Sequence, residues 1–585
     1  MKRWGKYIKP YWPYFVLGPL CMIVEVIGEV LMPRFLGEVI NNAASRTPWF
    51  SVGMAGGMVL CAVLMMVGGV GGAYFGARAS VNFAADLRLD IYRRVQHFSF
   101  ANIDKFSTGS LVTRLTNDVQ QMQQMVNMLL RMFLRSPGML IGALIMAITL
   151  RPSLAVVLAV TIPLMLLSIV GIILIGFPRF ARVQTRIDGL NSTVQENVTN
   201  VRVVKSFVRE DLEKEKFRRA NRDLKKTSMS ATKVMLFMSP VMTVFMNLTT
   251  IAVLWFGAPM VQSGMEIGDL SAFITYVTQI LSSLMMVTMM LMMSSRALAS
   301  ARRVREVLEE IPDIRDSESA DPNAVVTRGE IEFRGVDFRY YKDSEGKVLD
   351  GIDLCIPAGA TVGIIGSTGC GKTTLVSMIP RLYDVDGGEV LIDGRSVRDY
   401  TLYNLREGVG IVLQKNVLFS GSIEDNLRWG SEDATMEEIR TAARHAQADK
   451  FITSFRDGYG YDLGQGGKNV SGGQKQRLCI ARALLKKPRI IILDDSTSAV
   501  DTATEAQIRK AFREELSDST KIIIAQRITS VRDADMIVVM NEGRITGVGT
   551  HDELLVSNTE YKEIYDSQMD SVSRTESGKG EENNG

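Results

Sequence analysis

The segment Gly366-Ser367-Thr368-Gly369-Cys370-Gly371-Lys372-Thr373 decides the fold of the second half of the chain. It has the pattern G-x-x-x-x-G-K-[ST], in which glycines let backbone N–H groups wrap around phosphates. The apolar run 361–365 before it reads as a strand, and 374–381 after it reads as a helix. A strand, a glycine-rich loop and a helix in this order predict a phosphate-binding loop in an α/β domain.

The side chains of this loop have separate tasks in nucleotide binding. Lys372 is expected to bring a positive charge to the outer phosphates, and Thr373 to offer its hydroxyl to Mg²⁺. The motif therefore predicts a bound nucleotide and Mg²⁺. The predicted contacts of the phosphates are Gly366, Ser367, Thr368, Gly369, Cys370, Gly371, Lys372, Thr373 and Thr374.

A second acidic motif follows further along the chain, in Ile490-Ile491-Ile492-Leu493-Asp494. Four apolar residues that end in an acid describe a buried parallel strand with a carboxylate at its tip. Many core strands end in this way, so the pattern is weak by itself. Together with the phosphate loop it predicts that Asp494 binds the metal beside Thr373.

The first half of the chain contains six long apolar runs. They cover approximately residues 14–36, 52–75, 125–150, 154–177, 234–256 and 270–293. Each is near or above the ~20 residues that cross a hydrocarbon core, so a multi-pass membrane protein is predicted. The third run contains Arg131 and Arg135, which we expect at the membrane surface.

The charges between these runs predict their orientation. Four cations precede the first run: Lys2, Arg3, Lys6 and Lys9. They place the N-terminus in the cytoplasm, and the expected location is the cell inner (plasma) membrane. The two long connections, 81–124 and 179–233, are rich in Lys and Arg and show helical periodicity. We expect them to be helices that continue into the cytoplasm.

Length and composition set the predicted domain organisation. A chain of 585 residues is too long for one compact domain. We predict a transmembrane domain over 1–305, a linker over 306–325, a nucleotide-binding domain over 326–567 and a disordered tail over 568–585. The formal net charge of +3 and the lack of a long basic block argue against a nucleic-acid partner. Five cysteines without metal-ligand spacing read as free thiols.

A resemblance to a known family emerges at Ser471-Gly472-Gly473-Gln474. With this S-G-G-Q signature the chain resembles ATP-binding cassette (ABC) exporters, and the resemblance covers nearly the whole chain. It implies an all-α six-helix transmembrane domain followed by an α/β P-loop nucleotide-binding domain. It also implies that two cassettes sandwich two ATP molecules, so that the signature of one half faces the ATP of the other. The implied partner is a second ABC half-transporter.

Other positions match family motifs. Tyr340 resembles the aromatic residue that stacks on adenine, and Gln414 the glutamine that touches Mg²⁺ and water and contacts the transmembrane helices. Ser498-Ala499-Val500-Asp501 resembles the loop that passes between the two cassettes. The stretches 108–118 and 203–210 resemble the two cytoplasmic loops of the membrane half.

Two departures from the family pattern bear on hydrolysis. The family's catalytic Glu is replaced by Asp495, which is shorter by one methylene, and the switch His by Gln526, which cannot become cationic. Gln465 also stands where the family often has Glu. Neutral change around an active site is one reading. The other is the degenerate half of a heterodimeric multidrug exporter, with Asp495, Gln526 and Gln414 at a slow catalytic centre; we adopt this second reading.

The transported substrate is less well defined by the sequence. Glu25 and Glu29 lie one helical turn apart inside the first apolar run. They either attract a cationic substrate or form a salt bridge with Arg34 or with a neighbouring helix. A methionine-rich sixth run suits hydrophobic or amphipathic ligands next to membrane lipid. The alternatives are a homodimeric exporter of lipids or peptides and an ATP-gated channel or sensor, although no polar pore lining is evident.

Overall fold

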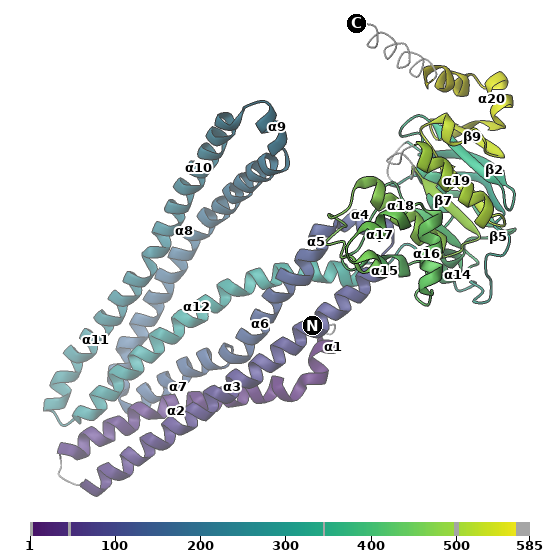
Figure 1. Ribbon diagram of the computed structural model, residues 1–585. Coiled ribbons are helices and arrows are strands. Elements are labelled where there is room, and N and C mark those ends of the chain that lie inside the picture. Colours follow the sequence, from purple (N-terminus) through teal and green to yellow (C-terminus); the bar gives the residue numbers. More distant parts are fainter. Residues whose placement is uncertain (1–3, 45–47, 343–345, 496–501, 569–585) are drawn as a thin grey trace. The chain divides into compact units, whose positions relative to one another are not determined.

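The computed structural model describes residues 4–44, 48–342, 346–495 and 502–568. The chain forms two compact units (Figure 1). The first, called the helical unit below, contains Met1–Val95 and Gly109–Glu309. The second, called the nucleotide unit, contains Gln96–Thr108 and Glu310–Gly585. A short piece of the membrane half of the sequence therefore belongs to the nucleotide unit.

Helices make up the helical unit. Among the described residues, six helical stretches are long and apolar enough to cross a membrane, and they coincide with the six predicted runs. The main helices are α2 (Trp12–Ala44), α3 (Pro48–Gln96), α6 (Val119–Met132), α7 (Arg135–Leu150), α8 (Pro152–Thr199), α10 (Glu210–Leu236), α11 (Met238–Gln262) and α12 (Ile267–Glu309). Shorter helices are α1 (Gly5–Ile8), α5 (Thr108–Thr113) and α9 (Val201–Ser206), and a π-helical turn covers Arg114–Asp118.

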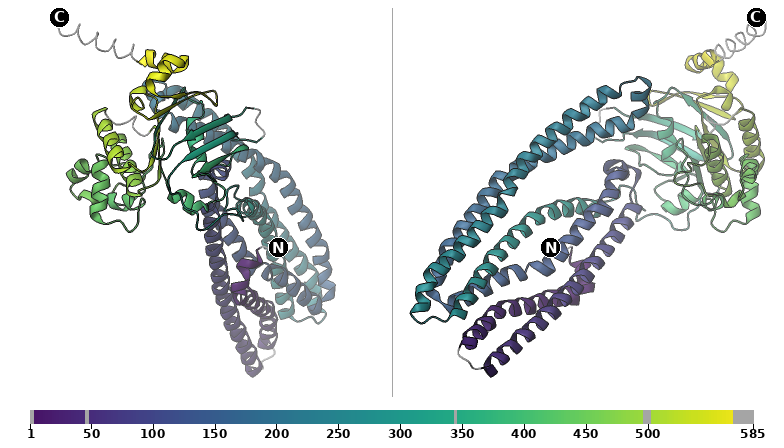
Figure 2. Two further views of the ribbon diagram at one scale, coloured as in Figure 1. Left: turned by 90° about the vertical axis from the view of Figure 1, so that its right-hand side faces the viewer. Right: turned by 60° about the vertical axis from the view of Figure 1, so that its left-hand side comes forward.

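The long helices pack in two groups that meet on α12. Helix α12 lies against α2 and α7, while α8 runs beside α10 and α11 (Figures 1 and 2). The buried core includes Phe273 and Tyr276 of α12 and Leu154 and Leu158 of α8. Helices α2 and α3 approach closely at Gly68, where a Cβ atom would lie 2.7 Å from the Cys21 carbonyl oxygen.

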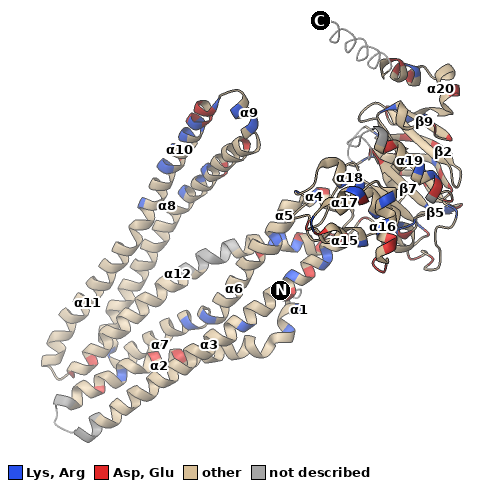
Figure 3. Cartoon of the chain, viewed as in Figure 1, with Lys and Arg blue, Asp and Glu red and all other residues tan. Residues whose placement is uncertain are grey.

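The two long polar connections are largely helical, as predicted. Residues 179–233 continue α8 and form α9 and α10. Residues 81–124 continue α3 to Gln96, break, and resume in the short helix α4 (Phe100–Phe106), which belongs to the nucleotide unit. Figure 3 shows charged residues gathered along α10 and around α9 and α5, with fewer on the apolar parts of the long helices.

The nucleotide unit is built on a six-stranded sheet in the order β10-β9-β3-β8-β7-β6. Its parallel strands are β9 (Met536–Asn541), β3 (Thr361–Gly366), β8 (Thr520–Ile524), β7 (Ile490–Asp494) and β6 (Val409–Val412), and β10 (Arg544–Gly549) pairs antiparallel to β9. Every residue of β7 and β8 is buried, as expected for parallel strands covered on both faces. The strands predicted before the phosphate loop and before the second acid are confirmed.

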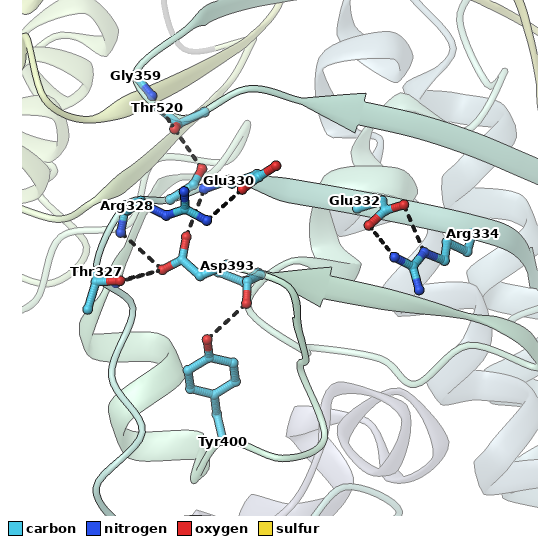
Figure 4. Close-up of polar contacts among 11 residues, drawn as sticks. Thr327, Arg328, Glu330, Glu332, Arg334, Gly359, Asp393, Tyr400 and Thr520 are labelled. Carbon is cyan, nitrogen blue, oxygen red and sulfur yellow. Dashed lines mark hydrogen bonds and ion pairs between the residues drawn. The ribbon is translucent and has the colours of Figure 1, made fainter.

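A second, antiparallel sheet has the order β2-β1-β4-β5. It contains β2 (Leu349–Ile356), β1 (Ile331–Phe338), β4 (Gly387–Ile392) and β5 (Arg395–Ser396). Asp393 fixes the entry to β1, because its carboxylate accepts hydrogen bonds from the backbone N–H groups of Thr327, Arg328 and Glu330 (Figure 4). Burial alone raises the pKa of Asp393, but these hydrogen bonds outweigh it and leave the pKa lowered.

Helices complete the nucleotide unit: α13 (Lys372–Met378), α14 (Leu402–Glu407), α15 (Ile423–Arg428), α16 (Met436–His445), α17 (Asp449–Ser454), α18 (Gly472–Leu485), α19 (Thr502–Glu515) and α20 (His551–Ser557). A further helical stretch covers 559–568. Gln568, which we predicted to begin a disordered tail, is therefore helical, and 569–585 lie outside the described residues.

Candidate nucleotide site

The phosphate loop leaves β3 and leads into α13, with a backbone that requires glycine. Gly366, Gly369 and Gly371 have φ values of 154°, 87° and 100°. At Gly366 a Cβ atom would lie 2.1 Å from the carbonyl oxygen of Met540, which no side chain could tolerate. Ser367, Thr368 and Gly369 are exposed at the tip, while Cys370 and Gly371 are buried at the base. The loop thus presents an open concave backbone of the kind that binds phosphates.

Lys372 lies across this loop. Its Nζ donates to the carbonyl oxygens of Gly366 at 2.8 Å and Ser367 at 2.7 Å. The ammonium group is thereby positioned over the concave backbone, at the mouth of the loop. A phosphate in the loop would exchange these two carbonyl acceptors for charged oxygens, which bind an ammonium more strongly.

Thr373 and Asp494 meet where α13 begins and β7 ends. The Thr373 hydroxyl donates to Asp494 Oδ1 at 3.0 Å. Asp494 is 2 % exposed, and this burial raises its pKa above the ordinary value, against the effect of the Thr373 hydrogen bond. One hydroxyl and one carboxylate side by side are oxygen ligands that suit Mg²⁺ shared with phosphates and water. The predicted metal pair is therefore brought together.

The next residue, Asp495, is engaged by two amides. Gln526 Nε2, just after β8, donates to Asp495 Oδ2 at 2.8 Å, and Gln414, just after β6, also hydrogen-bonds this carboxyl group. Burial raises the pKa of Asp495, and the two amide hydrogen bonds act in the opposite direction. The three predicted residues Asp495, Gln526 and Gln414 thus form one cluster beside the metal pair, and the switch position carries an amide.

Sequence reasoning missed Gln568, which supports the switch position. Its Nε2 donates to the Gln526 carbonyl oxygen at 2.8 Å, and its Oε1 accepts from the Ile528 N–H at 2.9 Å. One side chain therefore bridges the backbone on both sides of residue 527. The polar composition near the C-terminus gave no signal for this contact, because it depends on a fold that returns the chain to β8.

Tyr340 flanks the phosphate loop on another side. Its hydroxyl forms a 2.9 Å hydrogen bond with Thr374 Oγ1, and the residue is 43 % exposed. Its ring and that of Tyr383 are nearly perpendicular, with ring centroids 5.3 Å apart. Tyr383 in turn contacts Phe100 of α4, with ring centroids 6.1 Å apart. The sequence predicted Tyr340 but not the link through Tyr383 to α4.

The signature segment begins α18. Ser471 is the N-cap of this helix, and its hydroxyl accepts a hydrogen bond from the Gln474 N–H at 3.3 Å. Gln474 Oε1 accepts from the Ser471 N–H at 2.8 Å, which completes a capping box. Ser471 and Gly472 are exposed and Gly473 is half-buried, so the helix start is accessible from outside the chain. The segment Ser498–Asp501 lies outside the described residues.

The acid pair in the helical unit has an ionic partner that the sequence had left open. Arg135 Nη2 of α7 lies 3.2 Å from Glu25 Oε1 and 3.1 Å from Glu29 Oε2, both of α2. Arg34 pairs with Glu38 instead, at 3.2 Å. The alternative of a salt bridge with a neighbouring helix is therefore confirmed, and the membrane-surface position expected for Arg135 stays a prediction.

Comparison with known proteins agrees with this arrangement. The family description "ABC transporter transmembrane region" matches residues 15–284, and "ABC transporter" matches 349–498. The "Uncharacterized ABC transporter ATP-binding protein YfiB" of Bacillus subtilis is 36 % identical over 571 residues, which cover 97 % of this chain and 99 % of that protein. This chain belongs to the ABC transporter family.

Two further likenesses sharpen the assignment to ABC exporters. An "ATP-dependent lipid A-core flippase" of Syntrophus aciditrophicus is 31 % identical over 579 residues, with 97 % of this chain and 94 % of that protein covered. The solved structure of a bacterial Atm1-family ABC exporter with ATP bound gives a TM-score of 0.78 at 25 % identity. It covers 95 % of this chain and 98 % of that one. The ABC exporter chain therefore carries a transmembrane domain and an ATP-hydrolysing cassette.

Proposed function

We propose that this ABC exporter chain is the slow-hydrolysing half of a heterodimeric multidrug efflux pump. The observation that carries the proposal is the cluster of Asp495, Gln526 and Gln414 beside the intact pair Thr373 and Asp494. The parts that would hold ATP have the geometry that binding needs. The residues that would activate water are a short acid and two neutral amides.

The physical argument concerns the proton acceptor. A general base must reach the attacking water, and hydrogen bonds that stabilise its charged form make it a weaker base. The carboxylate of Asp495 is one methylene shorter than that of glutamate, and it accepts hydrogen bonds from Gln526 and Gln414. Gln526 cannot supply a positive charge to the γ-phosphate, whereas a histidine can. Both features reduce hydrolysis at this site and leave binding intact.

Two exposed surfaces support a partner chain. The start of α18, at Ser471 and Gly472, is open for the nucleotide of a second cassette. Helix α9 and the residues after it expose apolar side chains, with Phe207 71 % exposed. An apolar tip at the end of a polar helical extension is suited to a contact with a second chain. In the proposed pump, Ser471–Gln474 completes the competent site, whose phosphate loop, Glu and His belong to the partner half-transporter.

The proposed cycle follows from this arrangement. The N-terminus and the nucleotide unit lie in the cytoplasm, the spans cross the plasma membrane, and two bound ATP molecules close the two cassettes. Closure reaches the spans through the helical extensions and opens the cavity outward. When Mg²⁺ is bound at Thr373, Asp494 and Gln414, it neutralises phosphate charge. Hydrolysis at the partner's site then resets the pump.

ATP turnover by the reconstituted full-length chain tests the proposal. The chain is measured alone and with a half-transporter that has Glu after its second acid and His in its switch. We expect little turnover alone and fast turnover of the pair. In the pair, Lys372→Ala should leave most of the turnover, whereas the matching lysine change in the partner should remove it. Equal losses from both changes, or fast turnover of the chain alone, would identify two competent sites and a homodimeric exporter.

A lipid substrate is a second candidate, favoured by one surface of the helical unit. Five cations line a pocket of about 580 Å³ between α8 and α10, where the apolar run of α8 ends: Arg179, Arg222, Lys225, Lys226 and Lys233. Such a pocket fits an anionic headgroup, and a relative is named a lipid A-core flippase. Stimulation of the pair's ATP turnover by anionic but not by zwitterionic lipid would favour this candidate.

A further inference from the structure

A small cavity with a few polar groups lies among the candidate membrane-spanning helices of the helical unit, bounded by α2, α7 and α12. Its volume is about 160 Å³, and its wall includes Glu29, Arg135, Ser136, Gln279, Met139 and Met286. Pockets that enclose whole drug-sized ligands measure about 300–1,000 Å³. The cavity is therefore large enough for one polar group of a ligand and too small for its apolar body.

The charges around the cavity do not balance. Among the side chains that the structure describes there, Arg135 is shared between Glu25 and Glu29, at 3.2 and 3.1 Å, so two carboxylates face one guanidinium and one negative charge remains. Uncompensated charge at membrane depth is expensive and is kept where it has a function. A ligand that carries a single positive charge would bring the site to neutrality.

The polar groups of the wall define the ligand further. Among the residues that the structure describes, three buried polar atoms of the cavity wall have no hydrogen-bond partner: Arg135 Nε, Ser136 Oγ and Gln279 Oε1. Gln279 is held in place from its other end, because Nε2 donates to the Glu29 carbonyl oxygen at 3.0 Å. These unpaired atoms have almost no accessible surface, so the Glu29 carboxylate, whose side chain is 29 % exposed, is the acceptor that a donor group in the cavity can reach.

We propose that this cavity binds the primary ammonium group of an amphipathic organic cation. A primary ammonium has N–H donors for the Glu29 carboxylate, whereas a quaternary ammonium has none. Met139 and Met286 present soft apolar surface to the carbon chain next to the ammonium. That the ligand is also a transported substrate rests on the proposed export function; the binding itself does not.

Equilibrium binding in the absence of ATP tests the site. The full-length chain in lipid nanodiscs is titrated with dansylcadaverine, a fluorescent primary ammonium, and with its neutral N-acetyl derivative. We expect the wild-type chain to bind the ammonium at least tenfold more tightly, because a hydrogen bond to a charged group is at stake. Equal affinity for the two probes, or no binding of either, overturns the proposal. The cavity would then hold only water.

Two glutamate substitutions on α2 locate the binding. Glu29→Gln keeps the shape and removes the charge, and it should weaken the ammonium about tenfold without changing the neutral probe. Glu38→Gln is the matched control, because Glu38 pairs with Arg34 and does not line the cavity. If both variants weaken binding equally, the effect is one of general charge and the site is wrong. The wild-type comparison of two probes decides the matter even if a variant does not fold.

The binding test and the turnover test have separate outcomes. If the ammonium binds as expected while the pair shows no asymmetry in ATP turnover, the site stands and the heterodimer proposal fails. If turnover is asymmetric and the two probes bind alike, the heterodimer proposal stands and the ammonium site fails.

Discussion

The double substitution Asp495→Glu with Gln526→His should convert the proposed slow site into a fast one. In the wild-type chain, Gln526 Nε2 donates to Asp495 Oδ2 at 2.8 Å, and Gln414 also hydrogen-bonds this carboxyl group. Glutamate would extend the carboxylate by one C–C bond, roughly 1.5 Å. Histidine would replace a neutral amide with a group that can become cationic near the phosphate.

The size of the gain follows from this displacement. A misplacement on the order of 1 Å can cost about 10²-fold in rate, which corresponds to about 2.7 kcal/mol of activation free energy. A positioned general base contributes about 10²–10⁴-fold in all. We therefore expect the double variant to gain about 10²-fold in turnover at this chain's site. Asp495→Glu alone should gain less, because Gln526 remains as a neutral partner.

The assay must isolate turnover at one site. The chain is reconstituted with a partner half whose phosphate-loop lysine is changed to alanine, so that ATP is hydrolysed only in the loop that contains Lys372. Asp533→Glu, the same chemical change at an exposed residue near Arg513, is the control and should have no effect. Wild-type turnover within about threefold of the double variant would refute the reasoning, because Asp495 would then already be an adequate base.

Three further predictions concern the same unit. Tyr340→Ala should weaken ATP binding about tenfold, since stacking on an aromatic ring contributes about 1–3 kcal/mol per base, and equilibrium nucleotide binding measures it. Ser471→Ala should slow the pair's turnover at least tenfold and leave photolabelling of this chain's own loop unchanged. Asp393→Asn should destabilise the entry to β1 by about 2 kcal/mol and speed hydrogen exchange at Thr327–Glu330. The pKa of Asp393 is lowered in the folded protein. The stability difference between the wild-type chain and Asp393→Asn is therefore fully present above the ordinary aspartate pKa, and it is lost as the pH falls through the lowered pKa of the folded protein.

The features that sequence predicted correctly depend on local patterns. Length and hydropathy define the six spans, and the apolar runs at β3 and β7 define buried strands directly. The phosphate loop was predicted as well, because its glycines have φ values that few other residues adopt. In each case the residues that determine the feature are neighbours in the sequence, so the sequence alone is enough to predict it.

The features that sequence missed depend on contacts between distant segments. The two carboxylates on α2 have their partner more than a hundred positions away, at Arg135, and the sequence could name only a neighbouring helix as its source. Gln568 reaches Gln526 only because the C-terminal helix returns to β8. Tyr383 joins Tyr340 to α4 through ring contacts that no spacing rule encodes. Only a folded chain shows these pairs.

Binding and hydrolysis are separable in this site because they rest on different parts of the fold. The concave loop depends on backbone angles at Gly366, Gly369 and Gly371, and the metal pair depends on β7, whose residues are all buried. Changes at those positions would disturb the core. Asp495 and Gln526, in contrast, lie just beyond the ends of β7 and β8, and Gln526 is exposed. An acid that is one methylene shorter at position 495, and an amide in place of an imidazole at position 526, leave the sheet unchanged. A cassette can therefore lose the proton acceptor and keep the nucleotide, which is the property that an asymmetric pump requires of one of its halves.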